Sequence, residues 1–204
     1  MIGIISYGLG NIKAIQNVYH KLSRPVKIIN NSDDLSGVNK LILPGVGAFD
    51  YAMQKFNNSG LKEKISELVL KDEVPILGIC VGAQMLCLSS DEGSLPGLNW
   101  IEASVKKFKK EENKLKLQLP HMGWNDVKSL NESKLFEGMH EEARFYFLHS
   151  YYIDCKNSNQ VIATSEYPDK FVSSVNNKNI YGVQFHPEKS HQFGINLLDN
   201  FYRL

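Results

Sequence analysis

Short apolar strands alternate with helical segments between Ile2 and Leu88 of this 204-residue chain, and this alternation constrains the fold more than any other feature. β-rich runs are followed by stretches whose apolar residues recur at helical spacing. Strands joined through helices run parallel in one sheet, with the helices packed on its faces. The expected strands are Ile2–Ser6, Val26–Ile29, Lys40–Leu43 and Pro75–Cys80, and the expected helices are Asn11–Leu22, Leu61–Leu70 and Gly82–Leu88.

The pattern changes in the second half of the chain. Apolar and charged residues alternate over Ala103–Leu119, as in a solvent-facing antiparallel hairpin. Because no internal repeat or linker interrupts the sequence, we expect a single α/β domain over residues 1–204, with a mostly parallel mixed sheet, flanking helices and an antiparallel extension. The remaining expected elements are strands Phe145–Ile153, Gln160–Ser165, Phe171–Val175 and Ile180–Phe185, and a closing helix Gly194–Leu204.

Composition argues against several classes of partner. The formal net charge is +1, so no strong field draws the chain to nucleic acid or anionic lipid. The lysine-rich piece Lys106–Lys116 also carries acidic residues, and we interpret it as the solvated face of the hairpin. The three cysteines form no disulfide framework, and the first residues are typical of a strand and not of a signal peptide. We expect a soluble cytoplasmic protein with no membrane or nucleic-acid partner, no metal and no cofactor.

A nucleophile motif joins one expected strand to the helix that follows it. In Gly78-Ile79-Cys80-Val81-Gly82 the glycines let the strand and the helix approach closely across a sharp turn. Such a turn places Cys80 at the carboxyl edge of the sheet and near a helix N-terminus, whose dipole favours a thiolate. A buried structural cysteine between packing glycines explains this pentapeptide alone equally well.

A base and its orienting acid follow the strand that begins at Ile180. That strand delivers His186 to the same sheet edge as Cys80, and Pro187 ends the ladder pairing there. Glu188 can then bind one imidazole nitrogen while the other faces the sulfur, which fixes the tautomer. Alone, this pair would be interpreted as a surface histidine near a surface glutamate. Together with Cys80 it predicts a catalytic triad.

A glycine-rich loop, Pro44-Gly45-Val46-Gly47, follows another strand at this edge. Backbone N–H groups of such a loop can stabilise a developing oxyanion, and we expect Val46 and Val81 to be the two donors. Glycines on both sides of Val46 would let its peptide rotate toward the sulfur or away from it. An ordinary β-turn explains the tetrapeptide equally well.

These motifs, in this order and over nearly the whole chain, resemble the class I (triad-type) glutamine amidotransferase family. The resemblance implies a flavodoxin-like fold and hydrolysis of L-glutamine to glutamate and ammonia through a thioester on Cys80. It also implies substrate contacts from Gly45, Gln84, Glu92, His149, Ser150 and Tyr151. Without the resemblance, Gln84 would be a helix-surface residue and Tyr151 a core aromatic.

Four segments, 7–11, 44–49, 120–125 and 184–190, are similar to the glutaminase subunits of imidazole glycerol phosphate synthase. This resemblance implies a heterodimer with a (β/α)₈-barrel cyclase that uses the ammonia in L-histidine biosynthesis. It places Asn11, Trp124 and Lys189 against that partner, and His121 in a nearby loop. Val81 and Ala83 replace the larger residues usual in this group, which leaves open a paralogous glutaminase serving a sugar-modifying synthetase in surface-glycan biosynthesis.

Two other functions compete with glutamine hydrolysis. A cysteine peptidase or γ-glutamyl hydrolase would need an open groove, and the residues that match the glutamine clamp argue against it. A binding subunit without activity would have a broken triad, whereas Cys80, His186 and Glu188 are all present. Glutamine hydrolysis is therefore the preferred hypothesis.

Overall fold

The structure, a computed structural model, describes residues 1–108, 118–130, 133–139 and 143–204. Its helices are α1 Ile12–Lys21, α2 Phe49–Asn57, α3 Lys62–Leu70, α4 Val81–Met85 and α5 His191–Arg203. Its strands are β1 Ile2–Ile5, β2 Val26–Ile29, β3 Lys40–Gly45, β4 Ile76–Cys80, β5 Ser89–Ser90, β6 Ala103–Lys107, β7 His121–Asp126, β8 Lys128–Ser129, β9 Arg144–His149, β10 Tyr151–Cys155, β11 Val161–Glu166, β12 Lys170–Asn177 and β13 Ile180–Val183.

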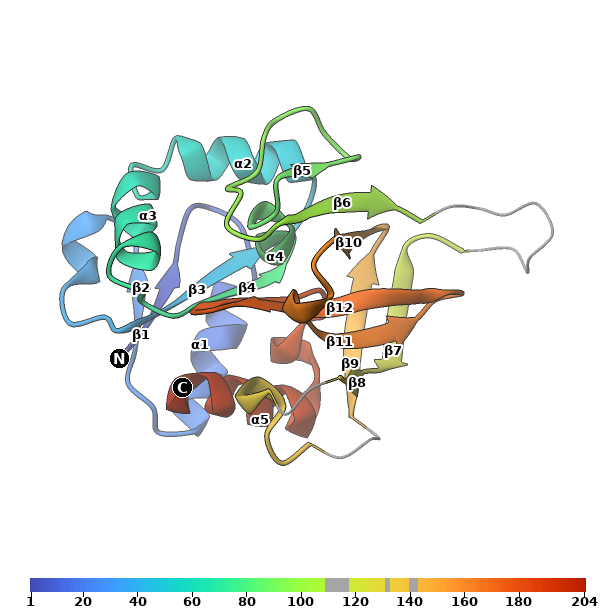
Figure 1. Ribbon diagram of the computed structural model, residues 1–204. Coiled ribbons are helices and arrows are strands. Elements are labelled where there is room, and N and C mark those ends of the chain that lie inside the picture. The colour runs from blue at the N-terminus through green and yellow to red at the C-terminus, as the bar shows by residue number, and fades with distance from the viewer. Residues whose placement is uncertain (109–117, 131–132, 140–142) are drawn as a thin grey trace.

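One large mixed sheet organises the fold, in the order β2-β1-β3-β4-β13-β12-β10-β6-β5, with β11 between β12 and β8. The strands from β2 to β13 are parallel, and β12, β10 and β6 continue the sheet in antiparallel pairing. Helices α1 and α5 cover one face of the parallel part, and α2, α3 and α4 cover the other (Figure 1). The expected fold class, a mixed sheet flanked by helices with an antiparallel extension, is confirmed.

The parallel strands are apolar throughout because helices cover both of their faces. Ile4 on β1, Ile42 on β3 and Leu77 on β4 are all fully buried. β3, β4 and β13 run in the same direction, so their carboxyl ends meet at one edge of the sheet. This edge is where the chain places the residues with reactive side chains.

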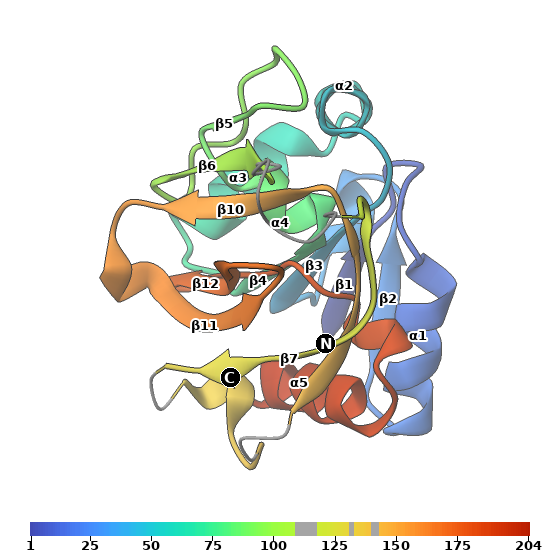
Figure 2. The same ribbon diagram turned by 90° about the vertical axis from the view of Figure 1, so that its right-hand side faces the viewer.

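One predicted strand is wrong in its extent. The expected Phe145–Ile153 strand is two strands that separate at Ser150 and join different sheets. β9 pairs with β7 in a small antiparallel sheet, whereas β10 enters the large sheet. In Figure 2, β10 lies beside β6, whereas β7 lies on the other side of β11 and β12. Alternation along the sequence does not reveal the break because both strands are partly buried on either side of it.

Three smaller differences concern the ends and number of the elements. β3 was expected to end at Leu43 but continues to Gly45 through its pairing with β4. Pro44 is tolerated there because the pairing of β3 with β1 ends at Ile42, so the missing N–H of Pro44 removes no hydrogen bond to β1. Helix α2 and strands β5, β7 and β8 were not predicted. Of the expected hairpin over 103–119, residues 109–117 lie outside the described residues, and so does most of the lysine-rich piece. In the described ranges, no helix has the length and apolarity needed to cross a membrane.

Candidate active site

Cys80 lies at the sharp turn between β4 and α4. Its φ of 54° and ψ of −114° are strained for a residue with a side chain, and such strain is typical of a nucleophile elbow. The flanking glycines make the turn feasible: a Cβ on Gly78 would lie 2.8 Å from the Ala83 backbone, and one on Gly82 would lie 2.0 Å from the Leu43 carbonyl oxygen. The thiol is 3% exposed and lies 3.8 Å from the carbonyl oxygen of Leu148.

His186 and Glu188 form a buried pair beyond the end of β13. The Nδ1 of His186 lies 2.8 Å from Oε1 of Glu188, and both side chains are almost fully buried. Because a carboxylate only accepts, Nδ1 carries the proton. Burial alone would lower the pKa of His186, but its hydrogen bonds and its electrostatic interactions with Cys80 and Glu188 raise this pKa to about 10. The imidazole therefore lies between the sulfur and the carboxylate and retains a proton at neutral pH.

Asn11 gives the Glu188 carboxylate a second donor. Its amide Nδ2 donates to Oε1 at 2.7 Å, the same oxygen that His186 contacts. Burial would raise the pKa of Glu188, but the hydrogen bonds from His186 and Asn11 hold that pKa below its usual value. The other oxygen, Oε2, is buried and has no hydrogen-bond partner among the described residues. Asn11 therefore orients the carboxylate from α1, a contact that the sequence did not reveal.

A cavity of about 270 Å³ opens over the sulfur. Its volume is near the lower end of the range of small-molecule sites, ~300 Å³, and suits an amino acid better than a peptide. Most of the predicted site residues meet here. Those lining it are Asn11, Val46, Gly47, Cys80, Val81, Gln84, Glu92, Pro120, Leu148, His149, Ser150, Tyr151, His186 and Lys189. Gly45, Trp124 and Glu188 do not line this cavity, and Glu188 lies behind His186.

Gln84 belongs to a buried amide pair and not to a helix surface. It is 3% exposed, and its Nε2 donates to the Tyr151 carbonyl at 3.2 Å and to Oε1 of Gln184 at 3.0 Å. The group left to face a ligand is therefore its carbonyl oxygen, an acceptor. Gln184 in turn donates to the sulfur of Cys80 at 3.8 Å. Sequence reasoning gave Gln184 no role, although it lies two residues before His186.

Glu92 and Gly45 each have a structural contact at the site. The Glu92 carboxylate lines the cavity and also accepts the backbone N–H of Phe49 at 2.9 Å, at the start of α2. Gly45 ends β3 opposite Cys80, and a Cβ there would lie 2.2 Å from the Gly82 nitrogen. Close packing against the elbow therefore requires a glycine at position 45. Gly47 has a φ of +87°, a backbone conformation that favours glycine, and a Cβ built there would meet no atom within 4 Å.

The residues predicted to face a partner lie in different environments. Trp124 is 41% exposed on β7 and stacks on His191 with ring centroids 5.1 Å apart. Lys189 lines the cavity, and its ammonium lies 5.8 Å from the centre of the Tyr146 ring. The prediction that His121 lies in a loop is wrong: it begins β7, is 4% exposed and pairs with His149. Its burial follows from the β7–β9 pairing, which the sequence pattern does not reveal.

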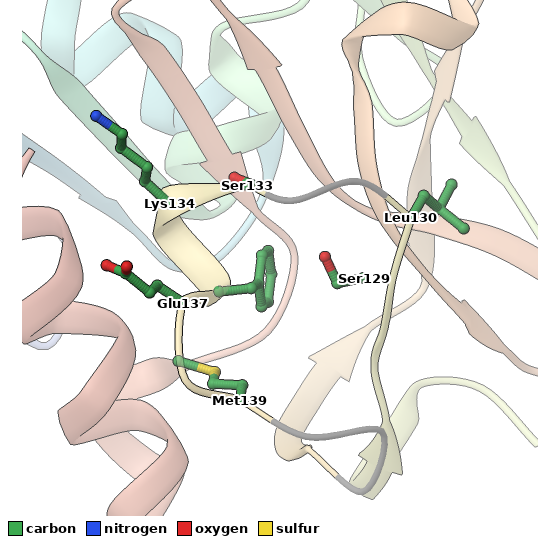
Figure 3. Close-up of a pocket in the computed structure, with 7 residues that line it drawn as sticks. Ser129, Leu130, Ser133, Lys134, Glu137 and Met139 are labelled. Carbon is green, nitrogen blue, oxygen red and sulfur yellow. The ribbon is translucent and has the colours of Figure 1, made fainter.

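A larger cavity, of about 770 Å³, lies between β8 and the short helix Lys134–Phe136. Figure 3 shows Lys134 and Glu137 at its margin, with Ser129 and Met139 also lining it. Among the described residues, its lining includes neither a cysteine nor a histidine, so its size does not indicate catalysis. Among the described residues no cluster of His, Cys, Asp and Glu could hold a metal ion.

Comparisons with known proteins agree with this geometry. The family model described as "Glutamine amidotransferase class-I" matches residues 4–204. "Imidazole glycerol phosphate synthase subunit HisH" of Bdellovibrio bacteriovorus is 53% identical over 98% of both chains, and that of Leptospira borgpetersenii is 47% identical over 100% of both. Among solved structures, a putative GMP synthase protein from Thermoplasma acidophilum has a TM-score of 0.72 at 26% identity, covering 98% of this chain and 90% of that one.

Proposed function

Because this chain belongs to the class I glutamine amidotransferase family, we propose that it is the glutaminase subunit of an imidazole glycerol phosphate synthase, acting in L-histidine biosynthesis. The observation that carries the proposal is the strained Cys80 beside the buried His186–Glu188 pair, under a cavity of amino-acid size. Full-length similarity to relatives named as this subunit supports the pathway. We assign the whole of residues 1–204 to one domain and place its activity in the cytoplasm.

The reaction begins with attack of the Cys80 thiolate on the side-chain amide carbon of glutamine. The new C–S bond turns the carbonyl oxygen into an oxyanion, which accepts hydrogen bonds from the backbone N–H groups of Val81 and Val46. His186 then donates its proton to the amide nitrogen, the C–N bond breaks and ammonia leaves. A thioester between the sulfur and the glutamyl group remains.

Water completes the cycle. His186, now neutral, takes a proton from a water molecule while the water oxygen attacks the thioester carbon. The resulting tetrahedral intermediate collapses, its C–S bond breaks, and glutamate and the Cys80 thiolate are released. Glu188 holds the imidazole in the Nδ1–H tautomer throughout, so Nε2 always faces the reacting atoms. The acceptor oxygen of Gln84 and the carboxylate of Glu92 suit the substrate ammonium, and the segment His149–Tyr151 completes the binding site.

The ammonia passes to a partner protein, which we propose is a (β/α)₈-barrel cyclase of the HisF type that makes imidazole glycerol phosphate and aminoimidazole carboxamide ribotide. An exposed apolar group beside the cavity supports this docking: Met122 is 65% exposed, Trp124 41% and Leu148 38%. Met122 and Leu148 are direct cross-strand partners in the β7–β9 sheet. Asn11, Trp124 and Lys189 lie at or near this proposed interface.

The test separates release of ammonia from its use. With Cys80→Ala in the complex with the barrel cyclase, glutamine-dependent product formation should vanish, whereas product formation from added ammonia should persist. Retention of glutamine-dependent turnover would remove Cys80 from the mechanism. If the wild-type chain copurifies with and feeds a sugar-modifying synthetase and not the barrel, the pathway assignment is wrong and the glutaminase chemistry stands.

A further inference from the structure

Two buried histidines lie opposite each other in the small sheet, and the mechanism above uses neither ring. His121 and His149 are direct cross-strand partners of β7 and β9, and both side chains are buried. The Nδ1 of His121 lies 2.9 Å from the Nε2 of His149. On the other side of His149, Nδ1 lies 2.7 Å from the carbonyl oxygen of Tyr151. The two rings therefore connect β7 to a segment that lines the cavity.

The proton positions in this chain of hydrogen bonds follow from its ends. The Tyr151 carbonyl can only accept, so His149 carries its proton on Nδ1 and its Nε2 is an acceptor. His121 must then donate from Nδ1, which leaves its own Nε2 to accept from the Asn125 amide at 3.2 Å. Each ring thus has one donor and one acceptor, and all four ring nitrogens are paired.

The surroundings keep both rings neutral. His121 stacks between Tyr167 and Phe147, with ring centroids 4.0 Å and 4.9 Å away, and Phe108 and Phe171 pack against His149. Burial lowers the pKa of His121 to about 4 and that of His149 to about 3. A neutral imidazole has a single N–H, so His149 accepts from His121 only in the Nδ1–H tautomer that the Tyr151 carbonyl selects.

The hydrogen bond from His149 to Tyr151 spans Ser150, the residue at which the chain leaves the small sheet and enters the large one. The same carbonyl also accepts from Gln84, and residues 148–151 line the cavity over Cys80. We propose that His121 is a positioning residue for glutamine: by donating to Nε2 of His149 it holds that ring in place, and so fixes the Ser150 turn against which the substrate binds. This inference rests on the proposed function.

Removal of the His121 N–H should therefore weaken substrate binding more than chemistry. In His121→Phe the ring stacking remains, but the buried Nε2 of His149 is left without a donor, so the ring is no longer held from both sides against the Tyr151 carbonyl. In the complete complex with the barrel cyclase, KM for glutamine should rise on the order of tenfold, the factor expected for one buried acceptor left unpaired. The value of kcat should change by less than about twofold.

Two further variants separate positioning from stability. In His121→Asn the amide nitrogen occupies the position of Nδ1, so KM should return toward the wild-type value. Phe147→Leu disturbs the same packing without touching a hydrogen bond, so it should lower Tm and leave KM unchanged. An unchanged KM in His121→Phe, or an equal rise in Phe147→Leu, would overturn the proposal. Failure of the wild-type complex to hydrolyse glutamine would instead overturn the proposed function.

A spectroscopic measurement tests the tautomer without activity. Long-range ¹H–¹⁵N correlation spectra of the wild-type chain should show the Nδ1–H tautomer for both His121 and His149 at neutral pH. In His121→Phe the ¹⁵N signal of the His149 Nε2 acceptor should shift because this nitrogen loses its hydrogen bond, and His121→Asn should restore it. An Nε2–H form of His149 in the wild-type chain would overturn the proposed chain of hydrogen bonds, whatever the kinetics show.

Discussion

The buried histidine pair predicts that mild acid destabilises this protein. Both rings are neutral in the folded chain, because burial lowers their pKa to about 4 and about 3, against an ordinary value of 6.5. Below pH 6.5 the unfolded chain binds protons at these histidines and the folded chain does not. The free energy of unfolding therefore falls as pH falls from 6.5 towards the folded pKa values.

The magnitude follows from these values. At pH 5 the unfolded chain binds a proton at His121 more strongly than the folded chain does, and this difference lowers the free energy of unfolding by about 2 kcal/mol. His149 lowers it by about the same amount. Together they account for about 4 kcal/mol, which is large beside a total stability of about 5–15 kcal/mol for an ordinary domain. His186 opposes part of this loss, because its raised pKa means that the folded chain already holds its proton above pH 6.5, where the unfolded chain does not. Carboxylates whose pKa is lowered, such as Glu188 and Asp199, contribute mainly below their unfolded pKa of about 4.

Urea unfolding of the full chain at pH 7.5 and pH 5.0 measures this loss. His121→Phe should be less stable than wild type at pH 7.5, but its loss between the two pH values should be about 2 kcal/mol smaller, because one titrating group is gone. Phe147→Leu is the matched control and should show the wild-type pH dependence. Equal losses in wild type and His121→Phe would refute the claim that the folded chain keeps His121 neutral.

Three further predictions concern catalysis. Glu188→Gln should keep the fold and lower the glutaminase kcat, by at most the factor of about 10⁴ known for the equivalent change in a serine protease; a change below about twofold would remove Glu188 from the triad. Asn11→Leu removes a hydrogen-bond donor from the Glu188 carboxylate and should raise the pKa of Glu188. The fall of kcat/KM on the acid side of its pH profile should therefore move to higher pH. An unchanged acid side would contradict the role of Asn11 in stabilising the carboxylate. The isolated chain should release ammonia about 10²–10³ times more slowly than the loaded complex if the Val46 N–H joins the oxyanion hole only when the partner binds, and equal rates would refute this switch.

The triad could be predicted from the sequence because its geometry is local. Cys80 ends β4 and His186 lies three residues beyond the end of β13, and glycine or proline lies near each of these strand ends. Parallel strands bring such ends to one edge, so residues far apart in the sequence meet there. Glu188 is only two residues from His186 in the sequence, so its carboxylate can contact the imidazole without any long-range pairing.

The supporting contacts could not be predicted because they depend on pairings between distant elements. His121 is buried because β7 pairs with β9, and Gln84 is buried because Tyr151 and Gln184 bind its amide. No local pattern distinguishes these residues from surface ones. Asn11 was expected near a partner, and its 2.7 Å contact with Glu188 depends on the docking of α1 beside residues 187–189.

The covalent intermediate tests the central claim most directly. Wild-type complex mixed with glutamine and quenched in acid within one turnover should carry a glutamyl group on Cys80, located by mass spectrometry of the peptide that contains it. Cys80→Ala should carry none, and the buried Cys87 and the half-buried Cys155 should remain unmodified in both. The account predicts that hydroxylamine releases this group, as it does from thioesters. Glutamine turnover without any adduct on Cys80, or with the adduct on another residue, would contradict the account.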